Sequence, residues 1–297
     1  MYLYRFGMRK LPFGLTPDTE FFCPLPTHLE AMNVLKFAID SGEALVKVVG
    51  EVGTGKTLLC RLLINELTKS RQVAYIPYPK LSARELKFAL AKELNIRISA
   101  SCRDDQLTGR IQTRLLNINK EKGPVLLIID EAQLLDNEGF ETLRLFTNLE
   151  TEFKKLVQIV IFGQPELDKK LSQNSLRQIK QRIAFSYQLK PLTVIQTAQY
   201  VKTRIGAATN QPFVMSVIAN RLLASYSGGI PRLINILCHK ALLLAFGQNK
   251  RQITALNIIR AAKDTESVKT WFQDHFSALI TSTLLLASGS AMAFLAF

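Results

Sequence analysis

The chain has 297 residues, of which 47% are hydrophobic and 21% are charged, and its formal net charge is +14. This composition supplies enough apolar side chains for a full core, which excludes a disordered or collagen-like chain. The length suits one large domain or two modest ones. The excess of positive charge fits an anionic partner, such as a nucleotide, a nucleic acid or an anionic lipid, and equally fits a well-solvated basic surface.

Cysteine and histidine are scattered along the sequence. No two cysteines form a C-x-x-C motif and no spacing matches a zinc site, so we expect reduced thiols in a cytoplasmic protein, with neither a disulfide nor a structural metal. These residues are Cys23, Cys60, Cys102, Cys238, His28, His239 and His275. His28 lies at the start of the first long helical pattern. It can lie near a base pocket, although a core or capping role is the favoured interpretation.

Residues 1–26 contain many prolines, glycines and aromatic residues and show no periodicity, which predicts an ordered loop with aromatic anchors. Thr27 and Glu30 have the spacing of a capping box, so a helix is predicted to follow as far as about Ser41. We therefore treat residues 1–26 as a segment that precedes the folded domain.

Short apolar runs alternate with helical patterns from residue 44 to Pro191. Strands are predicted at residues 44–49, 72–78, 125–129, 156–162 and 184–189. Helices are predicted at residues 56–69, at 82–94 with a Ser82–Glu85 capping box, at 104–120, and at 137–150 with Asn137 as the cap. Strands that alternate with helices indicate βαβ units and a parallel sheet. The run 125–129 is wholly apolar, which suits a strand buried on both faces.

The strands stop after Pro191, and only helical patterns follow. Thr193 and Gln196 form a capping box, and further helices are predicted at residues 214–226, 231–247 and 254–263. This change places a domain boundary near residue 191. Residues 27–191 are therefore expected to form an α/β domain, and residues 192–268 a small all-α domain.

Residues 276–297 are 22 residues without a single charge. As a helix they would span about 33 Å, which is enough to cross a hydrocarbon core of about 30 Å. Trp271 and Phe272 suit an interfacial aromatic belt. Basic residues before the segment would keep the preceding domains in the cytoplasm; they are Arg260, Lys263 and Lys269. We expect residues 271–297 to be a membrane segment, with a buried C-terminal helix as the alternative because seven of the 22 residues are Ser, Thr or Gly.

A glycine-rich stretch, Gly50-Glu-Val-Gly-Thr-Gly-Lys-Thr57, matches G-x-x-x-x-G-K-[ST] and lies between a predicted strand and a predicted helix. In that context backbone N–H groups close around phosphates, and the positive end of the helix adds to the attraction. The lysine would neutralise charge on the β- and γ-phosphates, and the threonine hydroxyl would bind Mg²⁺. The predicted phosphate site comprises Gly50, Glu51, Val52, Gly53, Thr54, Gly55, Lys56, Thr57 and Leu58.

Two adjacent acids, Asp130 and Glu131, directly follow the apolar run 125–129. The strand would deliver both carboxylates to the carboxyl edge of the sheet. There Asp130 can hold the hydration shell of Mg²⁺, and Glu131 can polarise the attacking water as a general base. Adjacent acids after a strand are often merely solvated, but the phosphate loop favours the catalytic interpretation.

Four other polar residues are candidates for contact with the terminal phosphate. Gln164 ends the fourth strand, next to the strand of the two acids in the usual order, and can orient the water or sense the γ-phosphate. Arg177 and Arg182 precede the fifth strand, where one of them, with Arg182 favoured, can reach the γ-phosphate of a neighbouring subunit. Arg232 begins a helix and can contact the γ-phosphate from the helical domain. The alternatives are a loop amide, two solvent-facing arginines and a helix-start salt bridge.

The motifs GEVGTGKT, LLIIDEAQ, FGQPEL, LRQIKQRI and GGIPRLIN together resemble those of an AAA+ ATPase. The opening PFGLTPDTEFF, followed by HLEA, is similar to the ExeA/GspA-type ATPases of type II secretion and type IV pilus systems, including those of MSHA pilus biogenesis. The resemblance covers about residues 10–265. It implies a five-stranded parallel sheet with helices on both faces, a small helical lid, and hydrolysis of ATP with Mg²⁺.

The resemblance also implies partners. Members of the family assemble into rings or other homo-oligomers and act with pilus or secretion assembly proteins of the inner membrane. The segment before the first helix, here Phe13–Thr16, helps to enclose the adenine. Longer secretion-type members continue into a peptidoglycan-binding domain, so cell-wall contact is expected to fall to a partner of this chain.

Three functions therefore compete. The first, which we favour, is a membrane-anchored Mg²⁺-dependent ATPase at the bacterial inner membrane, with its ATPase domain facing the cytoplasm. The second is a DNA-binding ATPase of the transposition-regulator kind, which suits the charge of +14 but gives no reason for the uncharged residues 276–297. The third is a nucleotide-dependent scaffold without hydrolysis, against which the intact Lys56, Asp130 and Glu131 argue.

Overall fold

The computed structural model describes residues 2–14, 23–99, 101–152, 154–211 and 215–268. The chain divides into two compact units, an α/β unit of residues 17–190 and a helical unit of residues 1–16 and 191–297. The N-terminal stretch 1–26, expected as a segment of its own, is thus shared between the two units.

Five parallel strands form the sheet of the α/β unit, in the order β2-β3-β4-β1-β5. The strands are β1 (Leu45–Gly50), β2 (Val73–Ile76), β3 (Val125–Ile129), β4 (Val157–Gly163) and β5 (Ile183–Leu189). The pairings between neighbouring strands are all parallel, so their carboxyl ends lie at one edge of the sheet. The predicted five-stranded parallel sheet is confirmed.

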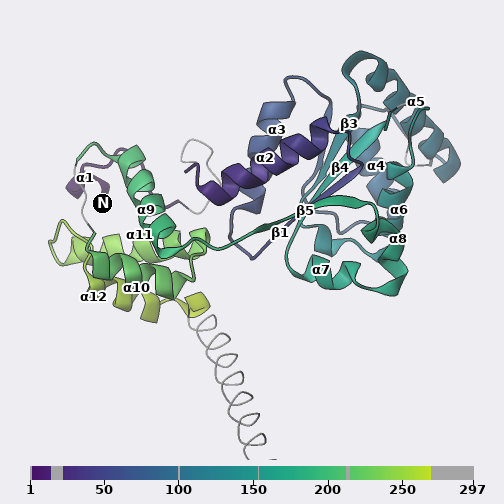
Figure 1. The fold of residues 1–297 in the computed structure, drawn as a ribbon. Helices are drawn as coiled ribbons and strands as arrows, with labels where there is room; N and C mark the ends of the chain where they lie inside the picture. The colour runs from purple at the N-terminus through teal and green to yellow at the C-terminus, as the bar shows by residue number, and fades with distance from the viewer. Residues whose placement is uncertain (1, 15–22, 100, 153, 212–214, 269–297) are drawn as a thin grey trace, which may run out of the picture. The chain divides into compact units, whose positions relative to one another are not determined.

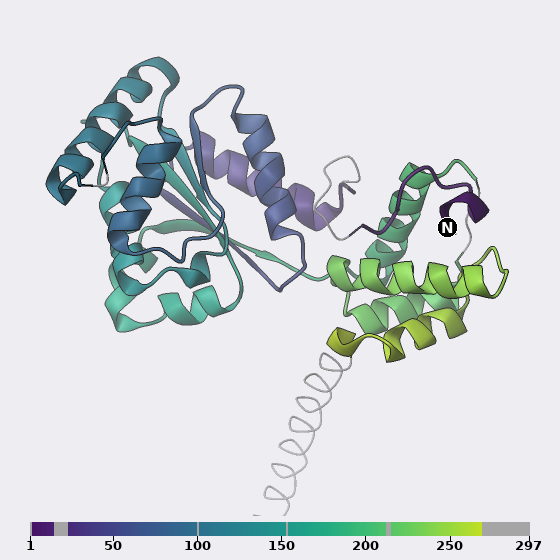
Figure 2. The same cartoon turned by 180° about the vertical axis from the view of Figure 1, so that it is seen from behind.

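Helices cover both faces of this sheet (Figures 1 and 2). On one face lie α2 (Pro26–Asp40) and α3 (Lys56–Leu67), whose buried residues include Leu35, Leu59 and Leu63. The other face is covered by α4 (Ala83–Glu93), α5 (Asp104–Lys122), α6 (Asn137–Thr147), α7 (Glu166–Leu171) and α8 (Arg177–Lys180). Strand β3 is buried along its whole length because helices cover both of its faces, as its apolar sequence predicts. Each fully buried Leu or Ile contributes about 1.5–3 kcal/mol to this core.

The helical unit contains α1 (Tyr2–Arg5), α9 (Val194–Ala208), α10 (Val217–Ser227), α11 (Pro231–Gly247) and α12 (Ala255–Lys263). Helix α11 carries the largest share of the buried side chains, among them Leu237, Cys238 and Leu242. The N-terminal stretch is fixed to this unit because Arg204 Nε donates a hydrogen bond to the carbonyl of Pro12 over 2.7 Å. Residues 2–5 are helical, where the sequence had predicted a loop.

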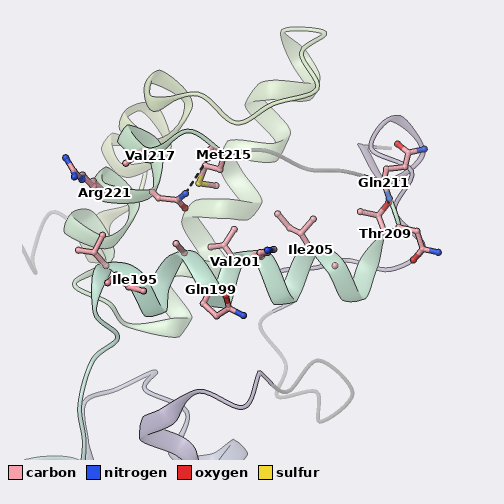
Figure 3. Close-up of a pocket in the computed structure, with 15 residues that line it drawn as sticks. Ile195, Gln199, Val201, Ile205, Thr209, Gln211, Met215, Val217 and Arg221 are labelled. Atoms are coloured by element: carbon pink, nitrogen blue, oxygen red, sulfur yellow. Dashed lines mark hydrogen bonds between the residues drawn. The ribbon is translucent and has the colours of Figure 1, made fainter.

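Helices α9 and α10, with residues 209–211 and Met215 between them, line a hollow of about 920 Å³ within the helical unit (Figure 3). Its apolar lining includes Val201, Ile205, Met215 and Val217, and the side chain of Ile195 is 82% exposed. Asn220 Nδ2 donates a weak hydrogen bond of 3.5 Å to the carbonyl of Met215 at this hollow. None of the predicted nucleotide residues lines it.

Two of the four predicted helix caps are present in the structure, and two are replaced by a nearby residue. The capping boxes at Ser82–Glu85 and Thr193–Gln196 are confirmed. The predicted box of Thr27 and Glu30 is wrong: α2 begins at Pro26, with Leu25 at the N-cap and no side-chain cap bond. Proline suits the first helical position because it has no N–H to satisfy there. Helix α6 is capped by the carboxylate of Asp136, which accepts from the N–H of Gly139, and not by Asn137.

The predicted membrane segment, residues 271–297, lies outside the described residues. Within the part of the chain that the structure does describe, no helix combines the length and apolar character needed to span a bilayer.

Candidate functional site

The phosphate loop, residues 50–57, joins β1 to α3 in the predicted order of strand, loop and helix. A Cβ added to Gly50 would lie 2.8 Å from Thr54 Oγ1 and 2.9 Å from Leu189 Cβ, so only glycine leaves room here. Gly55 is the N-cap of α3, with φ at +100°, in the region that favours glycine. The loop therefore presents backbone N–H groups at the positive end of a 12-residue helix, which is an arrangement that binds phosphate.

Lys56 is held inside this loop and is 5% exposed. Its Nζ donates to the carbonyl of Gly50 over 2.8 Å and to that of Glu51 over 3.0 Å. Burial lowers the pKa of Lys56, and the nearby Glu131, Asp130 and Glu51 oppose that shift. The ammonium group is thus placed where it can meet phosphate oxygens. Of the other predicted loop residues, Glu51 and Val52 are exposed and Leu58 is half-buried.

Thr57 and Asp130 are in direct contact. The Thr57 hydroxyl donates to Asp130 Oδ2 over 2.8 Å, and Asp130 Oδ1 accepts from the N–H of Glu131 over 2.9 Å. Burial raises the pKa of Asp130, although both hydrogen bonds oppose the shift. A hydroxyl and a carboxylate are the hard oxygen ligands that Mg²⁺ prefers, so this pair fits the predicted metal.

Glu131 is held by two glutamines. Gln164 Nε2 donates to Glu131 Oε2 over 2.8 Å, and Gln133 Nε2 donates to the same oxygen over 2.5 Å. The backbone N–H of Gln164 also donates to Gln133 Oε1 over 3.1 Å, which closes the group. Glu131 itself has φ at +53°, a conformation that residues other than glycine seldom adopt. Such backbone strain is concentrated at functional sites.

The strand order explains which of these residues could be predicted. Strand β4 lies next to β3, as the sequence analysis expected. Because β4 also lies next to β1, Gln164, directly after β4, falls between the phosphate loop and the two acids. Gln133 was not predicted as a site residue. The signals for it are its place at the end of the motif LLIIDEAQ and its position in the short 3-10 helix, Ala132–Leu134, that follows the two acids.

Neither Arg177 nor Arg182 is buried. Arg177 begins α8, and Arg182 lies in the turn before β5, where it adds to the larger effect of Lys155 in lowering the pKa of Glu150. Both are accessible to another molecule, and a role in a neighbouring subunit remains a prediction for either. Arg232 is exposed in the first turn of α11 in the helical unit, and its contact with the γ-phosphate also remains a prediction.

Two N-terminal features bear on the nucleotide. Phe13 is buried, and Leu15 and Thr16 lie outside the described residues, so enclosure of the adenine by this segment remains a prediction. His28 is a buried residue of α2, as the favoured interpretation held, but its ring also contacts the phosphate loop, with Nε2 3.0 Å from the carbonyl of Thr54.

Comparison with known sequences agrees with this geometry. Residues 39–171 match the family model of the AAA domain. The chain is 37% identical over 293 residues to general secretion pathway protein A of Aeromonas hydrophila, which covers 97% of this chain and 53% of the relative. The chain thus spans about half the length of that relative.

Solved structures share the fold at low sequence identity. Cdc6p from Pyrobaculum aerophilum has a TM-score of 0.64 at 18% identity, covering 83% of this chain and 71% of that one. The Aeropyrum pernix ORC1 protein, in complex with DNA, has a TM-score of 0.63 at 20% identity, covering 86% and 69%. The RuvB branch migration motor of Thermotoga maritima has a TM-score of 0.53 at 15% identity, covering 86% and 73%. Together with the matching AAA domain and the similarity to general secretion pathway protein A over 97% of this chain, the phosphate loop and its acidic strand show that this chain belongs to the AAA+ ATPases of the ExeA/GspA type.

Proposed function

We propose that this chain binds ATP and hydrolyses it with Mg²⁺. The observation that carries the proposal is the meeting of Lys56, Thr57, Asp130 and Glu131 at one edge of the sheet. Asp130 accepts hydrogen bonds from the Thr57 hydroxyl and from the N–H of Glu131. The negative charges of Asp130 and Glu131 also favour the charged form of Lys56. The match to the AAA domain supports the same activity.

Each residue has a defined part in the proposed reaction. Lys56 exchanges the carbonyls of Gly50 and Glu51 for β- and γ-phosphate oxygens of ATP. Mg²⁺, held through Thr57 and Asp130, would neutralise phosphate charge. Glu131 accepts a proton from water as the water oxygen attacks the γ-phosphorus, and the bond to the β–γ bridging oxygen breaks to release ADP. Gln133 and Gln164 keep the Glu131 carboxylate in place for that transfer.

ATP binding and turnover by the full-length protein test this proposal. Lys56→Ala should lose ATP binding and hydrolysis while its melting temperature stays close to that of the wild type. Lys36→Ala is a matched control, because Lys36 forms an exposed ion pair with Glu66. Chelation of divalent cations should stop turnover by the wild-type protein. Unchanged ATP affinity in Lys56→Ala would falsify the assignment of the phosphate loop.

We further infer that the ATPase acts as a homo-oligomer, either a ring or an ATP-dependent multimer. The support is the exposed Arg177 and the half-buried Arg182, either of which suits completion of a neighbour's site, and the family to which the chain belongs. Arg232 would contact the γ-phosphate from the helical unit.

We also propose a place for this ATPase at the bacterial inner membrane. Residues 276–297 would anchor it, with the ATPase unit in the cytoplasm. It would drive or regulate assembly of a type II secretion apparatus or an MSHA-like type IV pilus, together with inner-membrane assembly proteins. The uncharged length of the segment and the similarity to a general secretion pathway protein support this proposal.

Extraction from membranes tests the anchor. A spanning segment should resist high salt and yield only to detergent, whereas attachment through exposed charges is screened within about 8–10 Å at physiological ionic strength. Leu285→Arg should weaken insertion by about 2.5–3.5 kcal/mol if the residue lies near the bilayer centre, and Leu285→Ile is the matched control. Release by salt, combined with salt-sensitive binding to duplex DNA, would instead support the DNA-binding alternative.

A further inference from the structure

His28 connects helix α2 to the phosphate loop. It is the third residue of α2 and is 6% exposed, and its Nε2 lies 3.0 Å from the carbonyl oxygen of Thr54. A carbonyl oxygen only accepts hydrogen bonds, so Nε2 carries the proton and donates it. The same nitrogen lies 2.8 Å from the position that a Cβ on Gly55 would occupy. The imidazole therefore lies directly against the Thr54–Gly55 peptide.

That contact fixes the direction of one peptide plane. The bond between Thr54 and Gly55 is trans, so its C=O and N–H point in opposite directions. With the Thr54 carbonyl bonded to His28, the N–H of Gly55 must point away from α2. A glycine peptide turns easily because glycine tolerates both signs of φ, so a free peptide here would present either its N–H or its carbonyl on that side. In a phosphate loop, only the N–H attracts an anion.

Other contacts hold both sides of this bond in place. The Thr54 hydroxyl donates to the carbonyl of Glu51 over 2.8 Å, which closes the loop on its own side. On the other side, the hydroxyl of Tyr187 of β5 shares its proton between two acceptors near the start of α2, the carbonyl of Thr27 at 3.1 Å and Glu30 Oε2 at 3.0 Å. These contacts bind the start of α2 to β5, the strand that pairs with Gly50. The helix that carries His28 is therefore fixed relative to the phosphate loop.

We propose that His28 is a positioning residue for nucleotide binding, which holds the Thr54–Gly55 peptide with its N–H directed toward the phosphates. The inference rests on the proposed ATP-binding function. Burial lowers the pKa of His28, so the ring donates as a neutral group and adds no charge of its own to the site. Its effect is on the binding of di- and triphosphates, because Gly55 belongs to the phosphate-binding turn and not to a base pocket.

Two amide variants in the full chain separate this role from mere packing. The amide nitrogen of His28→Gln reaches about as far as Nε2, whereas that of His28→Asn is one bond shorter. His28→Gln should keep the affinity for ATP and ADP close to that of the wild type. His28→Asn should lose about fivefold to tenfold, as expected for one lost hydrogen bond. In both variants kcat at saturating ATP and the preference for adenine over guanine nucleotides should stay unchanged.

The outcomes are distinct. Equal affinity in all three proteins would overturn the proposal, and so would an equal loss in both variants, which would indicate packing alone. A change in the preference for adenine would show that His28 contacts the base instead. A wild-type chain that binds no nucleotide would overturn the proposed function itself, and this inference with it.

Discussion

The hydroxyl of Thr57 lies 2.8 Å from the carboxylate of Asp130, although the two residues are 73 positions apart in the chain. Thr57 belongs to the first turn of α3, and Asp130 directly follows β3, with β4 between the strands that lead to them. The contact puts a carboxylate that is only 2% exposed next to the phosphate loop. The fold thus keeps a buried acid at this position, where the proposed function needs its charge.

Asp130→Asn should therefore make the protein more stable and less active. Burial raises the pKa of Asp130, so the folded state binds its proton more tightly than the unfolded state does. Stability from this group is present at low pH and is lost as the pH rises above the usual aspartate pKa of about 3.9. The variant should unfold at a higher temperature than the wild type at neutral pH, and the two should converge in acid.

Melting curves across that pH range, with Mg²⁺-dependent ATP turnover measured in parallel, check this prediction. Asp105→Asn is the control, because Asp105 is exposed on α5 and should show no such gain. A less stable Asp130→Asn protein at neutral pH would contradict the expected sign.

Glu131→Gln should bind ATP and hydrolyse it about 10²–10⁴-fold more slowly, because the amide keeps the shape of the side chain and cannot accept the proton from water. Glu166→Gln is a matched control: Glu166 also acts on Lys56 through its charge, but it is exposed at the start of α7. Single-turnover hydrolysis and ATP affinity measured for both variants separate the base from the general loss of a negative charge. Near-normal turnover in Glu131→Gln would exclude it as the base.

Gln133→Leu should lower kcat about tenfold or more and leave ATP affinity unchanged. A hydrogen bond to a charged group contributes about 1.5–3 kcal/mol, and Gln133 donates one of the two that hold Glu131 Oε2. Because Gln164 donates to the same oxygen, the effects of Gln133→Leu and Gln164→Leu should not simply multiply in the double variant. Strictly multiplicative effects would show that the two glutamines act independently.

The parts of the site that could be predicted are local in sequence. The phosphate loop occupies consecutive residues, and the apolar run 125–129 predicts both a strand buried on both faces and the position of the two acids that follow it. Gln164 followed from one rule, that parallel strands end at the same edge. The contact of His28 with Thr54 joins residues 26 apart, and nothing in the sequence of α2 specifies which carbonyl its ring meets. Likewise, Pro26 displaced the cap predicted at Thr27, because proline suits the first helical position better than threonine suits the N-cap there.

The last prediction concerns the arginines before β5. If Arg182 completes the site of a neighbouring subunit, Arg182→Ala should bind ATP normally and hydrolyse it slowly. Mixing it with Glu131→Gln protein should then restore part of the activity, because some interfaces would join an intact Glu131 to an intact Arg182. Arg177→Ala, which removes an exposed arginine from the same stretch, serves as the comparison. A wild-type rate in Arg182→Ala, or no recovery at any mixing ratio, would exclude Arg182 from a role in trans and leave Arg177 as the candidate.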